Sequence, residues 1–259
     1  MKKILFLGYN RKKTNLIEII NNYSKNFHVT HLNKTISLKE LRKFDNVICF
    51  GYRYKIDKEI IENYKNKIIN LHIGYLPFNK GSHPNLWAFL ENTPSGITIH
   101  EVDKGIDTGK IIKQKIIDFD LPKNKNNLTF SKSYNILRKE IESLFIENII
   151  SILNYEYQSF DQIGKGSFHN KEDLPKILKK WDQKIYPVVK KYNKEQKKIM
   201  IEKLEILNEI EVTRKNNNIN WMNIVRTALK NSPKNTLDIL KDINHDDKKI
   251  STLFKKIVK

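Results

Sequence analysis

Residues Lys67–Gly81 read KIINLHIGYLPFNKG, in which the apolar pair Ile68-Ile69 is followed at once by Asn70 and His72. We interpret Lys67–His72 as a buried strand, and in open α/β sheets ligands bind beyond the carboxyl ends of the strands. Because side chains alternate along a strand, Asn70 and His72 point to the same side. An amide and an imidazole presented together can stabilise an oxyanion and transfer a proton. Two hydrogen-bonded polar residues at a strand end are the plainer alternative.

Three strand-like stretches precede this one, and helical stretches separate them. Strands that alternate with helices predict a doubly wound α/β fold with a mostly parallel sheet. Beyond the quoted stretch, a short helix and two more strands predict a hairpin-like addition. The expected strands are Lys3–Gly8, Phe27–Leu32, Asn46–Phe50, Gly96–Glu101 and Gly109–Asp118, and the expected helices are Thr14–Lys25, Leu38–Lys43, Ile56–Tyr64 and Asn85–Glu91.

The chain changes character after residue 163. Leu128–Tyr155 is predicted as a long amphipathic helix that closes the first part, whereas the later residues are rich in lysine. We expect a catalytic domain at 1–163 and a helical region at 164–259 that serves as a scaffold or for dimerisation, because narrow apolar stripes on its helices need a partner. Its expected helices are Lys171–Lys180, Lys194–Glu211, Trp221–Lys230 and Leu237–Asp242, with a break at Asn216–Asn218.

The chain of 259 residues is strongly basic. Its 48 lysines and arginines against 29 acidic residues give a net charge of +19. The excess is almost entirely lysine and is spread along the chain, whereas proteins that read nucleic acids rely on arginine forks and stacked aromatic residues. We therefore do not expect nucleic acid as a partner, although a basic helical tail that binds RNA is an alternative.

Other classes of site are excluded by what the sequence lacks. The single cysteine, Cys49, rules out an internal disulfide and any multi-cysteine metal site, and seven histidines without paired spacing argue against bound metal. The loop Gly8–Lys13 lacks the glycine pattern of a dinucleotide site. The apolar run Ile4–Leu7 is too short for a signal peptide, and no stretch approaches a membrane span. We expect a soluble, cytoplasmic protein.

Three further motifs change the interpretation of the pair at the strand end. Leu76-Pro77 is followed by GITIH at 96–100 and by DKGIDTGKII at 103–112. In this order and spacing, the motifs resemble the signature of the folate-dependent formyltransferases. The resemblance is dense from residue 50 to residue 114, and it implies a Rossmann-like formyltransferase core. The catalytic Asn, His and Asp of that family fall on Asn70, His72 and Asp107.

The resemblance also implies where two substrates bind. It implies 10-formyltetrahydrofolate as the co-substrate and a reaction without a metal. The residues implied to bind the folate are Gly74, Tyr75, Leu76, Pro77, Val102, Asp103, Gly105 and Ile106. The residues implied to bind the second substrate are Tyr9, Asn10, Tyr52, Arg53 and Lys80.

Within the family, FGYR at 50–53, NKGSHPN at 79–85 and ENTP at 91–94 resemble the enzymes that formylate amino sugars on nucleotide carriers. We predict a homodimeric N-formyltransferase that acts on the 3- or 4-amine of a dTDP-linked amino-dideoxy sugar. Its product would serve cell-surface polysaccharide, such as the O-antigen of lipopolysaccharide. The alternatives are formylation of methionyl-tRNA or another amine, and a folate- or sugar-binding module without catalysis.

Overall fold

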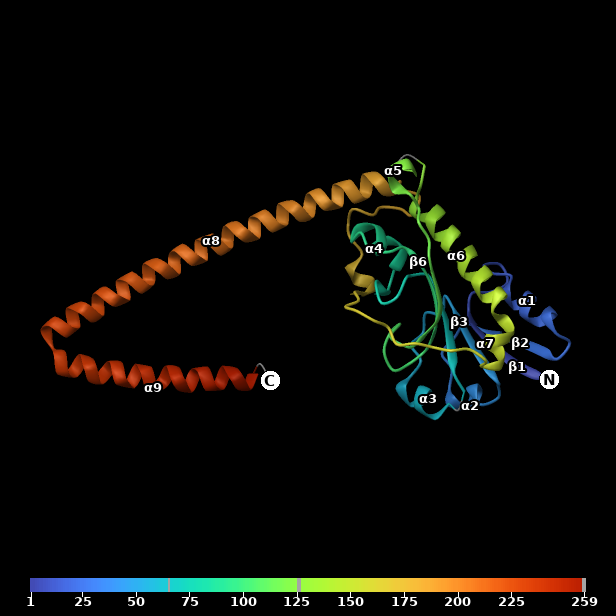
Figure 1. Ribbon diagram of the computed structural model, residues 1–259, viewed down its shortest axis with the longest axis horizontal. Helices are drawn as coiled ribbons and strands as arrows, with labels where there is room; N and C mark the ends of the chain where they lie inside the picture. The colour runs from blue at the N-terminus through green and yellow to red at the C-terminus, as the bar shows by residue number, and fades with distance from the viewer. Residues whose placement is uncertain (65, 125–126, 258–259) are drawn as a thin grey trace. The chain divides into compact units, whose positions relative to one another are not determined.

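The computed structural model describes residues 1–64, 66–124 and 127–257, and the chain divides into two units, Met1–Lys194 and Glu195–Lys259. The first unit is built on a six-stranded sheet in the order β2-β1-β3-β4-β6-β7 (Figure 1). The pairs β1–β2, β1–β3 and β3–β4 are parallel, whereas β4–β6 and β6–β7 are antiparallel. The expected α/β fold with a mostly parallel sheet is confirmed. The strands are β1 Lys2–Gly8, β2 Phe27–Leu32, β3 Asn46–Phe50, β4 Ile68–His72, β6 Gly96–Glu101 and β7 Ile111–Ile116.

Both faces of the sheet are covered by helices, and strand β1 shows how the sequence achieves this. Ile4 and Phe6 join the larger apolar core on one face, while Leu5 and Leu7 join the smaller core on the other. Successive side chains of a strand point to opposite faces, so an uninterrupted apolar run suits a strand buried on both sides. The helices are α1 Leu16–Tyr23, α2 Leu38–Leu41, α3 Lys58–Asn63, α4 Pro84–Leu90, α5 Leu121–Asn124, α6 Phe130–Glu147 and α7 Ile149–Asn154.

Helix α6 closes the larger core. It begins after Thr129, whose hydroxyl accepts a hydrogen bond from the backbone N–H of Lys132 at 3.2 Å. A threonine side chain satisfies a backbone donor that the first helical turn leaves without a partner. Leu137, Ile141 and Phe145 lie on one face of the helix and are fully buried. Each such side chain contributes about 1.5–3 kcal/mol relative to an exposed one.

After α7 the chain returns along the first unit as an irregular segment. We call residues 159–169 of this segment the strap. Phe160 of the strap forms an isolated antiparallel β-bridge with Ile111 of β7. Strand β8, Phe168–His169, pairs in parallel with β5, Lys80–Gly81. These contacts tie the strap to the first unit. The division of the chain therefore follows Lys194, later than the boundary at 163 expected from composition.

The lysine-rich segments differ from the expected short helices. Only a 3₁₀ turn at Lys171–Asp173 forms where a longer helix was predicted, because Pro175 disfavours helical backbone in the residue before it. Helix α8, Ile185–Asn231, begins before the expected Lys194, since Ile185 and Val188 are buried in the first unit.

Helix α8 also continues through the asparagines at 216–218 and ends only near Pro233, which opens α9, Pro233–Ile257. Asparagine lowers helix stability by a fraction of a kcal/mol, whereas an interior proline costs about 3 kcal/mol. The predicted break was therefore placed at the wrong residues. The predicted end of this region, residues 258–259, lies outside the described residues.

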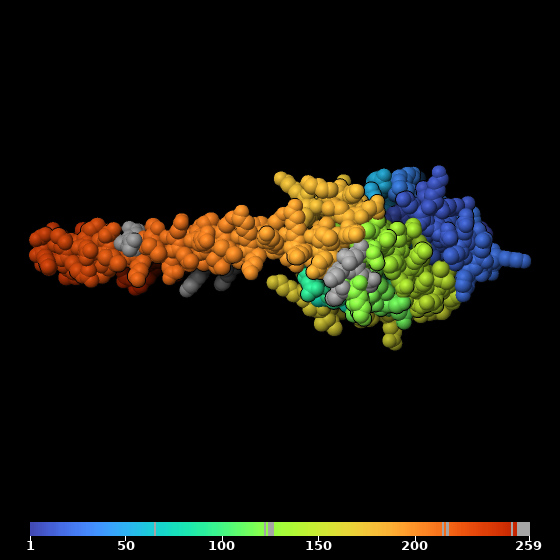
Figure 2. Space-filling model, turned by 90° about the horizontal axis from the view of Figure 1, so that it is seen from above, coloured from blue at the N-terminus to red at the C-terminus, as the bar shows by residue number. Residues whose placement is uncertain are grey.

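Apolar side chains along α8 lie at the surface. Ile199, Leu204, Leu207, Trp221 and Ile224 are all between 42% and 60% exposed. Figure 2 draws the atoms of α8 in orange tones. All five residues belong to the second unit, Glu195–Lys259. None of the described helices is both long enough and apolar enough to cross a membrane.

Candidate active site

Asn70 and His72 lie at the carboxyl end of β4, as predicted. The antiparallel pairing with β6 sets Asn70 opposite His100 and His72 opposite Thr98. His72 is 6% exposed, and Asn70 is half-buried. The strand therefore presents both side chains to one side, and β6 adds a second imidazole beside them.

Asp107 comes from the loop between β6 and β7, with its backbone in the left-handed region at a φ of 54°. One carboxylate oxygen, Oδ2, lies 3.6 Å from His72 Nδ1 and accepts a hydrogen bond of 2.9 Å from the backbone N–H of Gly81. The other, Oδ1, accepts from Asn70 Nδ2 at 3.3 Å and lies 3.5 Å from His100 Nε2. The fold thus brings together the three residues that the motifs marked, across 37 positions of sequence.

His100 determines how the Asn70 amide is oriented. His100 Nδ1 lies 2.7 Å from the backbone carbonyl of Glu101, which can only accept a hydrogen bond, so Nδ1 carries the proton of the neutral ring. Nε2 is then an acceptor, and Asn70 Nδ2 donates to it at 3.0 Å. The second N–H of Asn70 faces Asp107 in a longer contact. His100 thereby fixes the nitrogen of the amide toward the carboxylate.

The electrostatics of the site suit proton transfer. Burial lowers the pKa of His72 more strongly than the Asp107 carboxylate raises it, so the imidazole is neutral near pH 7. Burial alone would raise the pKa of Asp107. His72 and the hydrogen bond from the Gly81 N–H outweigh this effect and hold the pKa of Asp107 below its usual range.

His72 Nε2 is the atom that this arrangement leaves available to a ligand. It is buried and has no hydrogen-bond partner among the described residues. A side chain on Gly74 would meet it, since a Cβ there would lie 2.5 Å from Nε2. A buried polar atom without a partner is costly and is typical of a position kept for a ligand. The site can therefore accept a proton at Nε2 while Nδ1 faces a carboxylate.

His72, His100 and Asp107 also place ligand atoms within 4.8 Å of one another, as a metal site would. The donor set fits a metal poorly, because Asn70 directs an N–H at His100 Nε2 and another at Asp107. A cation would need those same lone pairs. The cluster fits a proton-transfer network better.

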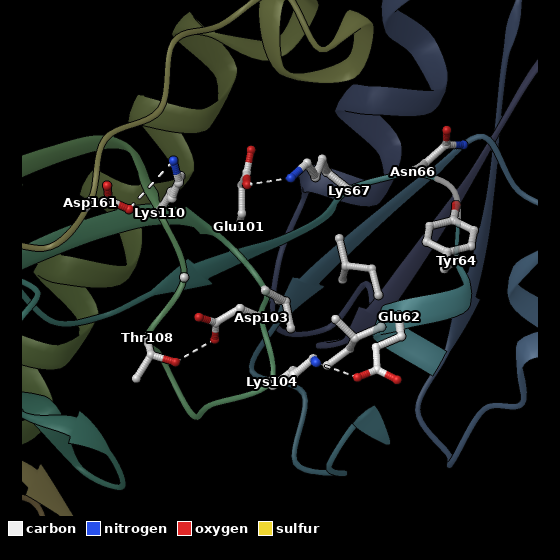
Figure 3. Close-up of a pocket in the computed structure, with 14 residues that line it drawn as sticks. Glu62, Tyr64, Asn66, Lys67, Glu101, Asp103, Lys104, Thr108, Lys110 and Asp161 are labelled. Atoms are coloured by element: carbon white, nitrogen blue, oxygen red, sulfur yellow. Dashed lines mark hydrogen bonds and ion pairs between the residues drawn. The ribbon is translucent and has the colours of Figure 1, made fainter. Parts of the chain in front are cut away.

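A pocket of about 510 Å³ lies against the loop between β6 and β7, which also carries Asp107 (Figure 3). Ile61, Ile68 and Val102 supply apolar walls, and polar side chains surround the rim. Ion pairs between Lys67 and Glu101 at 3.0 Å, and between Lys110 and Asp161 at 3.6 Å, hold that rim (Figure 3). Thr108 and Gly109, which directly follow Asp107, also line the pocket, so the pocket adjoins the loop that carries this carboxylate.

The residues predicted for folate fall in three places. Val102 and Asp103 line the pocket. Gly105 and Ile106 lie in the loop between β6 and β7. The N–H of Gly105 donates to the Asp103 carboxylate, and Ile106 is 49% exposed. The stretch 74–77 lies instead against β6, since the Thr98 hydroxyl donates to the Gly74 carbonyl and accepts from the Leu76 N–H.

The residues predicted for the second substrate are more scattered. Tyr9 packs edge-on against Phe50, and its hydroxyl is hydrogen-bonded to that of Tyr134. Asn10 caps a turn by accepting from the N–H of Lys12, and the Tyr52 hydroxyl donates to the Lys34 carbonyl. These three side chains have structural partners.

Arg53, in contrast, is exposed, and Lys80 is half-buried beside the strap. The positive charges of Lys171 and Arg53 act together with burial to lower the pKa of His83. The ring of Trp181 lies 5.1 Å from the ring of His83, at 40°. Sequence reasoning did not single out Trp181, and the only local signal was an aromatic residue in a lysine-rich segment.

Gln162 was missed as well. Its side-chain Nε2 donates to the backbone carbonyls of Asp107 at 2.8 Å and of Gly109 at 2.9 Å. No motif surrounds it, and no spacing rule connects it to the loop that it holds.

The comparisons with known proteins agree with the geometry. Residues 4–139 match the sequence model of a family described as formyl transferase. The chain is 38% identical to the formyltransferase PseJ from Anoxybacillus kamchatkensis, solved in complex with UDP-4,6-dideoxy-4-formamido-L-AltNAc and tetrahydrofolate. That superposition covers 72% of this chain and 97% of the other, with a TM-score of 0.65.

Curated relatives also match by sequence, among them the following two. The methionyl-tRNA formyltransferase of Mycoplasma genitalium is 32% identical over 148 residues, which are 56% of this chain and 46% of the relative. The dTDP-4-amino-4,6-dideoxyglucose formyltransferase of Mycobacterium bovis is 23% identical over 137 residues, 53% of this chain and 56% of the relative. The chain spans about half the length of these curated relatives.

Proposed function

The chain belongs to the formyl transferase family, and we propose that it transfers the formyl group of 10-formyltetrahydrofolate to the primary amine of a nucleotide-linked amino-dideoxy sugar. The proposal depends above all on the convergence of Asn70, His72 and Asp107 around a buried imidazole nitrogen that has no partner among the described residues. The similarity to PseJ supports the sugar branch, because it extends over 97% of that chain.

The reaction needs no covalent enzyme adduct. The amine nitrogen attacks the formyl carbon, and the carbonyl electron pair moves onto the oxygen. Neutral His72 takes the amine proton on Nε2. As the bond from the formyl carbon to the folate nitrogen breaks, the same proton passes to that nitrogen. The products are a formamide and tetrahydrofolate, and the enzyme is unchanged.

Asp107 and Asn70 stabilise the charges of this sequence. Asp107 Oδ2 faces His72 Nδ1, so it favours the imidazolium that exists between the two proton transfers. Asn70 holds one N–H on His100, and the other makes only a 3.3 Å contact with Asp107. The developing oxyanion can replace that long contact and accept this N–H.

We place the pterin ring of the folate in the pocket of Figure 3. Its volume, about 510 Å³, lies in the range of about 300–1,000 Å³ that is usual for small-molecule sites. The apolar walls Ile61, Ile68 and Val102 suit a flat bicyclic ring. The formyl group would then extend along Thr108 and Gly109 toward Asp107.

We place the nucleotide on the patch formed by Arg53, His83, Lys171 and Trp181. Trp181 is 42% exposed beside His83, which offers an aromatic surface for a base. Stacking of a base on such a ring contributes about 1–3 kcal/mol. The two cations complement a diphosphate. His83 follows Gly81 closely in the chain, and the Gly81 N–H binds Asp107, so the patch lies beside the catalytic residues.

An activity screen tests the proposal. The full chain is incubated with 10-formyltetrahydrofolate and with UDP- or dTDP-linked 3-amino and 4-amino sugars, and the formamide is detected by mass. We expect the UDP-linked 4-amino sugars to react fastest, given the ligand of PseJ. Absence of any formamide with every sugar would contradict the proposal.

Formylation of methionyl-tRNA is the second candidate, because the Mycoplasma genitalium enzyme is 32% identical over 148 residues. Charged methionyl-tRNA is therefore included in the same screen. Formation of formyl-methionyl-tRNA at a rate above that of every sugar would establish this candidate instead.

We also propose that the exposed apolar side chains of α8 pair with a second copy of the chain. Symmetric pairs are the commonest soluble oligomers. We further propose that the protein acts in the cytoplasm and that its product is used to make cell-surface polysaccharide.

A further inference from the structure

We infer that the strap, residues 159–169, positions the catalytic carboxylate, and that Gln162 is its positioning residue. The inference rests on the proposed function only for its kinetic readout. The strap lies outside the residues that match the family model, which end at 139. It nevertheless holds Asp107 in two places, once at the main chain and once at the carboxylate.

The main chain of Asp107 is held by Gln162. Asp107 has a φ of 54°, a left-handed conformation that an aspartate adopts only when its surroundings stabilise it. Gln162 Nε2 donates to the Asp107 carbonyl at 2.8 Å and to the Gly109 carbonyl at 2.9 Å, so it joins both sides of the turn. The adjacent bridge between Phe160 and Ile111, with bonds of 2.8 and 2.9 Å, fixes the strap next to this turn.

The carboxylate of Asp107 is held through β8. Gly81 N–H donates to Asp107 Oδ2, and Gly81 itself lies in β5, which pairs with β8 of the strap. The N–H of Lys80 donates to the Ser167 carbonyl at 3.0 Å, and the N–H of Ser82 donates to the His169 carbonyl at 2.8 Å.

His169 anchors this end of the strap. Its ring stacks on Trp87 of α4, with centroids 3.9 Å apart and planes at 7°, and its Nε2 lies 3.1 Å from Glu91 Oε1. Gly81 therefore keeps its N–H on the carboxylate because the strap holds β5 in place.

The chemistry of Gln162 makes the inference testable. Both of its partners are carbonyl oxygens, so only a donor can serve at this position, and its own Oε1 is buried without a hydrogen-bond partner among the described residues. Gln162→Lys keeps donors of similar reach. Gln162→Glu presents oxygen to oxygen, and Gln162→Leu presents no polar atom. Gln158→Leu, at an exposed position just before the strap, is the matched control.

Two measurements are made on the full-length variants. In steady-state kinetics with the sugar found by the screen, Gln162→Glu and Gln162→Leu should lose about 10- to 100-fold in kcat, because a small displacement of a reacting group has effects of that size. The KM for the folate should stay within a few-fold. Gln162→Lys should retain most of the turnover, and Gln158→Leu all of it.

The second measurement does not depend on activity. The charge of Asp107 raises the pKa of His72, while burial and His100 lower it. If the carboxylate moves away, the pKa of His72 should fall, which NMR titration of the imidazole follows once the signal is assigned with His72→Gln. Normal kcat and an unchanged His72 titration in Gln162→Glu would overturn the inference. So would a lowered melting temperature without any change in the titration, which would mark a purely structural role. If no sugar reacts, the titration alone decides.

Discussion

Replacing Asp107 by asparagine should remove most of the turnover and leave the fold intact. The carboxylate oxygen Oδ2 lies 3.6 Å from His72 Nδ1 in a nearly buried site. At an effective dielectric constant of about 20, two unit charges at this separation attract each other by about 4 kcal/mol. That attraction acts only while His72 carries the amine proton, so its loss raises the barrier and should lower kcat by about 10³-fold.

The same change is expected to be mild for stability. The oxygen of the new side-chain amide can still accept the Gly81 N–H, and the amide nitrogen can donate to His100 Nε2, although it then meets the Asn70 amide nitrogen. Steady-state rates and thermal melting are measured together. Asp57→Asn, at the exposed start of α3 without a side-chain cap, is the matched control and should behave as wild type. Turnover of Asp107→Asn within about tenfold of wild type, a loss under about 1.4 kcal/mol, would refute the role given to the carboxylate.

Four more results are expected. If His72 acts in its neutral form, as proposed, turnover should rise with pH along a limb centred below 6.5, because burial lowers the pKa of His72; a limb centred above that value would contradict the assignment. His72 and Asp107 both have lower pKa values in the folded protein than in the unfolded chain, so the unfolded state binds more protons. The melting temperature should therefore fall as the pH drops from about 6.5. A melting temperature that holds steady or rises over this range would argue against both shifts. Arg53→Ala should raise the KM for the sugar nucleotide about tenfold or more, since a charge-assisted contact contributes about 1.5–3 kcal/mol, and should spare the folate; equal effects on both substrates would place Arg53 elsewhere. A chain that ends at Lys194 should keep its activity and lose self-association in light scattering. A chain that ends at Gln158 should lose activity, because it lacks the strap and also Lys171 and Trp181 of the proposed nucleotide site; an active chain ending at Gln158 would show that all of these are dispensable.

Much of the site could be predicted from the sequence because its signals are local. Asn70 and His72 are two positions apart on one strand, and strand geometry alone places both side chains on the same side. Asp107 was predicted from a motif. Its distance from His72 depends on the register in which β6 pairs with β4. The pattern of alternating strands and helices was sufficient to predict the sheet that sets this pairing.

The amino-acid sequence by itself thus determined the α/β core, the end of the sheet that carries the site and the three residues proposed to react. Only the tertiary structure decided what holds them. Gln162 lies 55 positions from Asp107, and nothing in its neighbours indicates that its amide binds the turn that carries Asp107. The same is true of Trp181 beside His83. Periodicity and motifs record how a residue relates to its near neighbours in the chain, whereas these contacts arise when distant segments pack against a sheet already formed.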